Sequence, residues 1–265
     1  MRSKYLAIMI HKTAIISKSA VIAADVNIGP YTVINDDVVI GEGSIIDSHV
    51  VISGSTIIGK KNHIYSFASI GGDPQDKKYN NERTSLIIGD GNTIREYCSI
   101  NRGTSQDKGK TVLGDNNWIM AYVHIAHDCN VGSNVIFANN ATLAGHVHVG
   151  DWAIFAGFTG AHQFTRIGAH SFIGMNTLTT KDIPAYVMAE GQPIKPRGVN
   201  TEGLKRRGYS TEQITNIKNA YRILYRKDLK LSESLKKIKE LANDQKELEL
   251  LLESIKLASD RGIIR

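Results

Sequence analysis

Residues 21–40 read VIAADVNIGPYTVINDDVVI, with isoleucine at every sixth position. The same spacing begins at Ile10, runs unbroken to Ile70, and returns from Ile88 to Ile100. A period of six matches neither the 3.6-residue turn of a helix nor the two-residue alternation of a plain strand. It matches short strands separated by turns. Each six-residue unit is therefore predicted to form one strand, of four or five residues, and one corner.

A second series with the same period runs from Leu113 to Ile173, displaced by one residue from the first. Polar segments at 72–87 and 101–112 interrupt the repeat. Long loops in a regular solenoid are usually functional or disordered. The fixed phase argues against a sandwich of amphipathic strands, which would show turn clusters at irregular spacing.

Glycine often follows the repeated aliphatic residue, as at Ile28-Gly29 and Val149-Gly150, where a backbone bend favours a residue without Cβ. This pattern resembles the hexapeptide-repeat family. The resemblance implies a mainly β chain folded as a left-handed parallel β-helix of triangular cross-section, with 18 residues in each coil. We expect this solenoid to span residues 1–192, with loops at 72–87 and 101–112, and its first strand to lie in the run Leu6–Ile10.

Residues 193–265 are predicted to form a C-terminal α-helical domain, with helices beginning near residue 197. Pro184, Pro193 and Pro196 mark the transition, and Ser210 with Gln213 makes a capping box before an apolar helical face. Further helices are expected at 232–242 and 245–258. The annex should cover the open strand edge of the last coil.

The composition is that of a globular protein, with 42% hydrophobic and 22% charged residues. Two cysteines, Cys98 and Cys129, form no disulfide framework, which favours a reducing compartment and a cytoplasmic protein. No segment is long and apolar enough to span a membrane. The net charge of +6 favours an acidic partner, and we expect no nucleic acid.

Candidate catalytic residues follow from the 18-residue coil. His127 stacks on Gly145 and then on Gln163, with His146 and His162 one position to either side and His124 nearby. An imidazole accepts a proton from an alcohol near neutral pH, and Asp128 can fix its tautomer. The Gly145 amide can donate to an oxyanion. A base beside an oxyanion donor indicates acyl transfer.

Two alternatives compete with this interpretation. Hexapeptide-repeat carbonic anhydrases bind zinc through three histidines between subunits, and the histidines here are superficially suitable: His124, His127, His146 and His162. A catalytically silent scaffold, such as an ice-binding solenoid, would show flat threonine ladders and no loops. The sequence has neither property.

Four further motifs make the resemblance more specific: HIAHDC at 124–129, ANNATLAGH at 138–146, HQF at 162–164 and VNTEGLKRRG at 199–208. Together and in this order they resemble the family of UDP-N-acetylglucosamine O-acyltransferases, which open lipid A biosynthesis. The resemblance extends over nearly the whole chain. It implies a transferase that moves a 3-hydroxyacyl chain from the phosphopantetheine of acyl carrier protein to the sugar 3-hydroxyl.

By this resemblance His127 is the general base, Asp128 assists it and the Gly145 amide stabilises the oxyanion. No metal and no other cofactor is expected. The implied substrate-binding residues comprise sugar and phosphate contacts, cleft-lining residues, an acyl-length ruler, and uridine and diphosphate contacts: Asp76, Lys78, His124, His146, His162, Gln163, Met175, Asn200, Glu202, Arg206 and Arg207.

The family is homotrimeric with sites between subunits, and the distance along the repeat from His127 to Met175 favours a contribution from a partner chain. Two departures from the family pattern stand out. Asn101 replaces a frequent histidine, which leaves open a 3-amino variant of the sugar as acceptor. Met175 occupies the position of the acyl-length ruler, where its thioether is expected to shorten the preferred chain.

Overall fold

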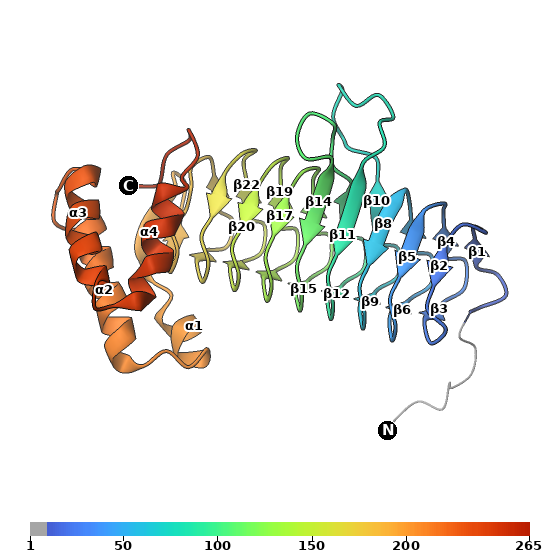
Figure 1. Cartoon of the computed structure of the whole chain (residues 1–265), viewed down its shortest axis with the longest axis horizontal. Coiled ribbons are helices and arrows are strands. Elements are labelled where there is room, and N and C mark those ends of the chain that lie inside the picture. The colour runs from blue at the N-terminus through green and yellow to red at the C-terminus, as the bar shows by residue number, and fades with distance from the viewer. Residues whose placement is uncertain (1–9) are drawn as a thin grey trace.

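The computed structural model describes residues 10–265 and shows a long prism of stacked short strands with helices at one end (Figure 1). Three sheets form the sides of the prism, which gives it a triangular cross-section. Most of the predicted first strand, Leu6–Ile10, lies outside the described residues; Ile10 itself makes a parallel bridge to Ile28. The chain winds through three sheets in turn, so within residues 15–179 the strands adjacent in one sheet are three strands apart in sequence. This is the left-handed parallel β-helix that the repeat predicts.

The first sheet contains β1 (Ile15–Ile16), β4 (Val33–Ile34), β7 (Val51–Ile52), β10 (Ser69–Gly72), β13 (Ser99–Asn101), β16 (His124–Ile125), β19 (Thr142–Leu143), β22 (Gly160–Ala161) and β25 (Leu178–Thr179). The second contains β2 (Val21–Ile22), β5 (Val38–Ile40), β8 (Ser55–Ile58), β11 (Ser85–Ile88), β14 (Lys110–Leu113), β17 (Asn130–Val131), β20 (His148–Val149) and β23 (Arg166–Ile167). The third contains β3 (Asn27–Ile28), β6 (Ile45–Ile46), β9 (His63–Ile64), β12 (Thr93–Ile94), β15 (Trp118–Ile119), β18 (Ile136–Phe137), β21 (Ile154–Phe155), β24 (Phe172–Ile173), β26 (Val187–Glu190) and β27 (Lys195–Val199).

The repeated aliphatic side chains fill the prism interior. Ile34 pairs with Ile52 in the sheet register, and both are buried. Most strands contain two residues rather than the expected four or five, because each corner takes residues out of the strand. One corner residue adopts a left-handed backbone, as at Tyr31 and His49, and this turns the chain through the corner of the triangle.

Two loops leave the prism on one side, where they stand out above β10, β11 and β14 in Figure 1. They cover 73–84 and 102–109, and are shorter than the predicted interruptions because four strands extend into the polar segments. The insertions preserve stacking: Ser69 pairs with Ser99, and Ser99 pairs with His124. The repeat therefore regains its phase after each loop, and distant residues share one face.

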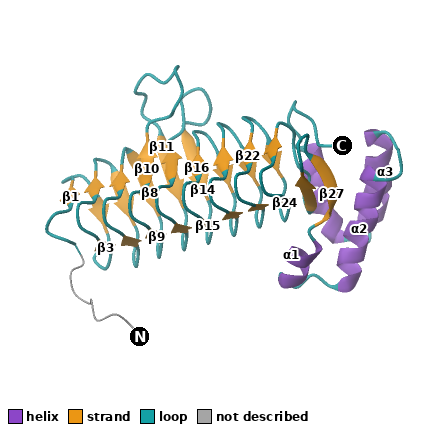
Figure 2. Cartoon of the chain, turned by 180° about the vertical axis from the view of Figure 1, so that it is seen from behind, coloured by secondary structure: helices purple, strands orange, loops and turns teal. Residues whose placement is uncertain are grey.

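The C-terminal part begins with an antiparallel pairing of β27 on β26. Helices follow at α1 (Thr201–Arg206), α2 (Thr211–Tyr225), α3 (Leu231–Ala242) and α4 (Glu249–Lys256), with a 3-10 turn, η1 (Lys246–Leu248). The capping box of Ser210 and Gln213 is present at the start of α2. Figure 2 shows the helices, in purple, beyond the last coil of the prism.

Ser254 of α4 accepts a hydrogen bond from the backbone of Ala185, at 3.0 Å, which ties the helices to the end of the solenoid. Among residues 10–265, no helix has both the length and the apolar character required to cross a membrane.

Candidate active site

The corner between β16 and β17 carries a histidine–aspartate pair. His127 Nδ1 lies 2.8 Å from Asp128 Oδ2. The left-handed backbone of Asp128, at φ 58°, turns its carboxylate back towards the neighbouring ring. Its side chain is only 1% exposed, whereas that of His127 is 13% exposed. The pair thus presents a partly accessible imidazole whose Nδ1 is occupied, leaving Nε2 for a substrate.

Gly145 lies in the next coil, directly against this imidazole. A Cβ at position 145 would stand 2.6 Å from His127 Cε1 and 2.8 Å from Nε2, closer than real Cβ contacts. Only glycine leaves room for the ring. Within residues 10–265 the Gly145 N–H donates no backbone hydrogen bond, so it is free to donate to a ligand oxygen.

His146 lies between two carboxylates, beside the His127–Asp128 pair. Its Nδ1 lies 3.0 Å from Asp107 Oδ2 and its Nε2 lies 3.8 Å from Asp128 Oδ2. The ring stacks on Phe164 with 4.5 Å between centroids and meets the His127 ring edge-on. The corners of three successive coils thereby build one polar column, as the 18-residue arithmetic predicts.

His124 contacts the preceding coil, where its Nδ1 lies 2.7 Å from Ser99 Oγ. Burial, reinforced by the neighbouring His127, lowers the pKa of His124. A neutral imidazole at this position offers its second nitrogen to a substrate without adding positive charge beside the candidate base.

Sequence reasoning missed Thr104 and Asp107, which reach the site from the 102–109 loop. Both oxygens of Asp128 accept hydrogen bonds from Thr104, one from its N–H and one from its hydroxyl. Burial raises the pKa of Asp128, but the hydrogen bonds from His127 and Thr104 outweigh it and hold that pKa below its ordinary value. The carboxylate is therefore ionised at neutral pH beside the imidazole. The only signal in the sequence was the interruption of the repeat.

The side chains that could bind a metal ion near His127 differ from those of the zinc alternative. Ligand atoms of His127, Asp128 and His146 lie within 4.8 Å of one another. Of the four histidines considered for zinc, only two belong to this cluster, since His124 faces Ser99 and His162 turns to the Gln163 carbonyl. Both Asp128 oxygens and His127 Nδ1 are already engaged in hydrogen bonds, so the histidine–aspartate pair accounts for the short distances in this cluster.

An open pocket of about 740 Å³ adjoins His146 and lies between the prism and residues 257–261. Phe164, Arg166 and Lys181 also line it. His127 is not among its lining residues, so this pocket borders the histidine–aspartate pair without containing it.

The remaining cleft residues lie on the surface. His162 and Gln163 are exposed at the corner before β23, and Met175 is 70% exposed at the corner before β25. Asp76 and Lys78 lie in the 73–84 loop, where the Lys78 N–H donates to Asp76 at 3.0 Å. Among the described residues, none of these side chains makes a hydrogen bond or ion pair with His127.

The C-terminal candidates occupy the helical end of the molecule. Asn200 is buried and caps α1 by accepting from the Gly203 N–H, and Glu202 pairs with Lys205 at 2.9 Å. Arg207 lies over the Trp152 ring and donates to the Trp152 carbonyl, whereas Arg206 is exposed. A single chain thus brings His127, Asp128, Gly145 and His146 together, and leaves the C-terminal set apart from them.

The chain was compared with known proteins. The family model described as "Udp N-acetylglucosamine O-acyltransferase; Domain 2" matches residues 182–264, and the bacterial transferase hexapeptide model matches residues 19–54 and 110–145. A Thiobacillus denitrificans protein named acyl-[acyl-carrier-protein]–UDP-N-acetylglucosamine O-acyltransferase is 59% identical over 256 residues, which cover 97% of this chain and 99% of that one.

Solved structures agree with the sequence relatives. The Francisella novicida UDP-N-acetylglucosamine acyltransferase superposes with a TM-score of 0.95 at 46% identity, covering 97% of this chain and 94% of that chain. LpxA from Acinetobacter baumannii gives a TM-score of 0.95 at 47% identity, covering 97% and 100%. With this identity over nearly its full length, the chain belongs to the acyl-[acyl-carrier-protein]–UDP-N-acetylglucosamine O-acyltransferase family.

Proposed function

We propose that this enzyme transfers a 3-hydroxyacyl chain from acyl carrier protein to the 3-hydroxyl of UDP-N-acetylglucosamine, the first step of lipid A biosynthesis. The observation that carries the proposal is the placement of the His127 ring against both the Asp128 carboxylate and Gly145. Family membership supports both substrates.

In the proposed reaction His127 Nε2 takes the proton of the sugar 3-hydroxyl as the oxygen attacks the thioester carbonyl. The new C–O bond forms a tetrahedral oxyanion, to which the Gly145 N–H donates. Collapse breaks the C–S bond and returns the proton from His127 to the departing thiolate. Asp128 keeps the proton on Nδ1 and stabilises the imidazolium. This sequence uses no acyl-enzyme, metal or other cofactor.

The substrate residues outside the histidine column require a second chain in this proposal. Asp76 and Lys78 protrude from the prism, while Asn200, Glu202, Arg206 and Arg207 belong to the helical end. We propose a homotrimer in which each site is completed by the neighbouring subunit. The buried, free thiols of Cys98 and Cys129 accord with the proposed cytoplasmic location.

Asn101 stands where the family often has a histidine, and this difference leaves the identity of the acceptor sugar open. Its amide donates to the Asp73 carbonyl at 2.9 Å, and its Oδ1 is buried with no hydrogen-bond partner among the described residues. A 3-amino sugar nucleotide, which offers an N–H where the proposed substrate offers an O–H, is therefore the alternative acceptor to test.

The test incubates the purified chain with 3-hydroxyacyl carrier protein and either UDP-N-acetylglucosamine or its 3-amino analogue. Mass spectrometry then measures the acylated sugar nucleotide. We expect an ester product from UDP-N-acetylglucosamine. Exclusive formation of an amide from the analogue would replace the proposed acceptor, and no acyl transfer to either sugar would refute the function.

A further inference from the structure

The 102–109 loop meets the candidate catalytic pair through one residue. Thr104 is 1% exposed, and its N–H donates to Asp128 Oδ1 at 2.9 Å while its hydroxyl donates to Asp128 Oδ2 at 2.7 Å. We propose that Thr104 is a positioning residue that fixes the Asp128 carboxylate and, through it, the His127 imidazole. This inference rests on the proposed role of His127 as the base.

The hydroxyl of Thr104 determines which of two imidazoles the Asp128 carboxylate contacts. Asp128 Oδ2 lies 2.8 Å from His127 Nδ1 and 3.8 Å from His146 Nε2. With one residue donating to both carboxylate oxygens, the carboxylate cannot rotate, and Oδ2 stays directed at His127. Without the hydroxyl, a side chain that is 1% exposed loses one of the two donors to Oδ2, and His146 becomes a competing partner.

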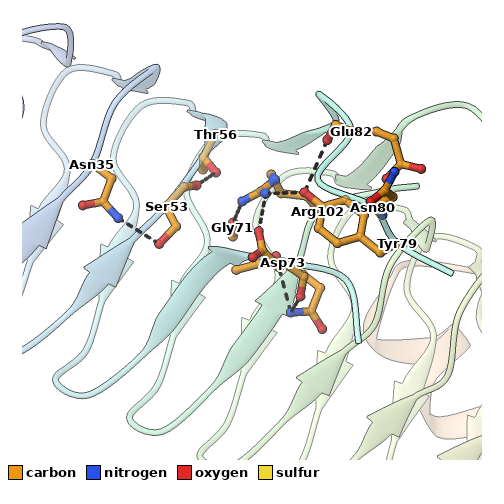
Figure 3. A network of polar contacts seen from close by, with 11 residues as sticks. Asn35, Ser53, Thr56, Gly71, Asp73, Tyr79, Asn80, Glu82 and Arg102 are labelled. Carbon is orange, nitrogen blue, oxygen red and sulfur yellow. Dashed lines mark hydrogen bonds and ion pairs between the residues drawn. The ribbon is translucent and has the colours of Figure 1, made fainter. Parts of the chain in front are cut away.

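The backbone that carries Thr104 is itself fixed. A Cβ at Gly103 would stand 2.2 Å from the Lys110 backbone nitrogen, so the two ends of the loop touch. Arg102, with a 10% exposed side chain, donates to the Gly71 carbonyl, to Asp73 and to the Tyr79 hydroxyl (Figure 3). This network joins the 102–109 loop to the 73–84 loop, and a rigid support of this kind is what precise positioning requires.

The pH dependence of the reaction reports on this contact. The titratable or charged groups that face the pair are His124 from β16, His146 from the next corner and Asp107 from the loop. Without the Thr104 hydroxyl, Oδ2 is free to turn towards His146, and the carboxylate then attracts the proton on His127 less strongly. The acidic limb of the rate profile therefore moves to lower pH.

The experiment compares Thr104→Val and Thr104→Ala, which lack the hydroxyl, with Thr104→Ser, which keeps it. Ser105→Ala is the matched control, because that exposed hydroxyl on the same loop contacts Glu82 instead. Each variant is assayed for kcat/KM from pH 5 to 9 and for its melting temperature. We expect Val and Ala to lose about tenfold or more of kcat/KM, because a hydrogen bond to a charged group is removed, and to shift the acidic limb to lower pH. Ser is expected to restore both.

A second arm places Thr104→Val in an Asp128→Asn background. Because the threonine acts through the carboxylate, we expect little further loss there, whereas an independent structural role would add its full effect. Unchanged activity and pH profile in Val and Ala would overturn the proposal, as would a loss that follows the melting temperature with an unshifted profile. Failure of the base assignment is separate, since it would appear as retained activity in His127→Ala.

Discussion

The imidazole of His127 occupies the space that a side chain at Gly145 would need: an added Cβ would approach Cε1 to 2.6 Å. Because both residues lie on fixed corners of adjacent coils, neither backbone can yield easily. The glycine therefore leaves room for the ring, and in the proposed mechanism its N–H also donates to the oxyanion.

Gly145→Ala should reduce kcat/KM by about 10²-fold or more, because displacing a catalytic group by about 1 Å costs that much. The measurement is steady-state kinetics together with thermal melting. Gly198→Ala is the matched control, since a Cβ at Gly198 meets nothing within 4 Å. Equal activity in the two variants would show that the close approach of Gly145 to His127 has no catalytic importance.

His127→Ala should lower kcat by about 10²–10⁴-fold while the fold survives, as is usual when a general base is removed. The chain supplies a control of similar geometry on an earlier coil, where His63 Nε2 lies 3.2 Å from Asp47 Oδ2. His63→Ala removes a histidine–aspartate pair without approaching Gly145. Retention of wild-type turnover within tenfold by His127→Ala would place the base elsewhere.

The sequence predicts the solenoid because the interior admits one aliphatic side chain per short strand, and this requirement repeats every six residues. It also predicts the meeting of His127 with Gly145, because stacking in a parallel coil is simple addition. It does not predict the contacts of Thr104 or Asp107. Those residues belong to the 102–109 loop, which has no repeat and therefore no stacking register. Their contacts depend on the folded conformation of the loop, in which Gly103 lies against Lys110.

The substrate-binding residues implied by family resemblance show the same division. Asn200 is placed by its capping of α1, while Met175, His162 and Gln163 remain exposed within the single chain. Their proposed roles depend on a partner surface, which no periodicity within one chain encodes.

The zinc alternative makes a direct prediction about purified enzyme. Because both oxygens of Asp128 already accept hydrogen bonds and the Nδ1 atoms of His127 and His146 each face a carboxylate, we expect acyl transfer to persist after dialysis against a chelator. Metal analysis of the same sample should show no stoichiometric zinc. Loss of acyl transfer on chelation, restored by zinc, would contradict the metal-free mechanism.

His170 couples pH to stability at the helical end. Burial, together with the nearby Arg207, lowers its pKa from 6.5 to about 4. Between these values the unfolded chain binds a proton that the folded chain does not, so acidification favours unfolding. The free energy of unfolding should therefore fall as pH drops from about 6.5 to 4.

Urea unfolding of wild type and His170→Gln across this range checks the prediction. The variant lacks the titrating group, so its stability should depend less steeply on pH. Some dependence should remain because burial also lowers the pKa values of His124 and His148. Identical slopes in the two proteins would mean that His170 is not the group responsible.

Met175 tests the proposed acyl-chain ruler. Its side chain is 70% exposed, and its Cε would lie 4.0 Å from a Cβ at Gly157, so it projects over the surface of the preceding coil. If the acyl chain passes along this surface, the thioether shortens the space available to it, and Met175→Gly should lengthen that space.

We expect the ratio of kcat/KM for long over short 3-hydroxyacyl carriers to rise about tenfold or more in the variant, since exclusion of a few methylenes at about 0.8 kcal/mol each is relieved. Competition between carriers of different length in one reaction measures that ratio directly. Leu178→Ala, which alters another exposed apolar side chain on the next strand, controls for a general change in surface hydrophobicity. A wild-type enzyme that already prefers the longest donors would refute the occlusion by Met175.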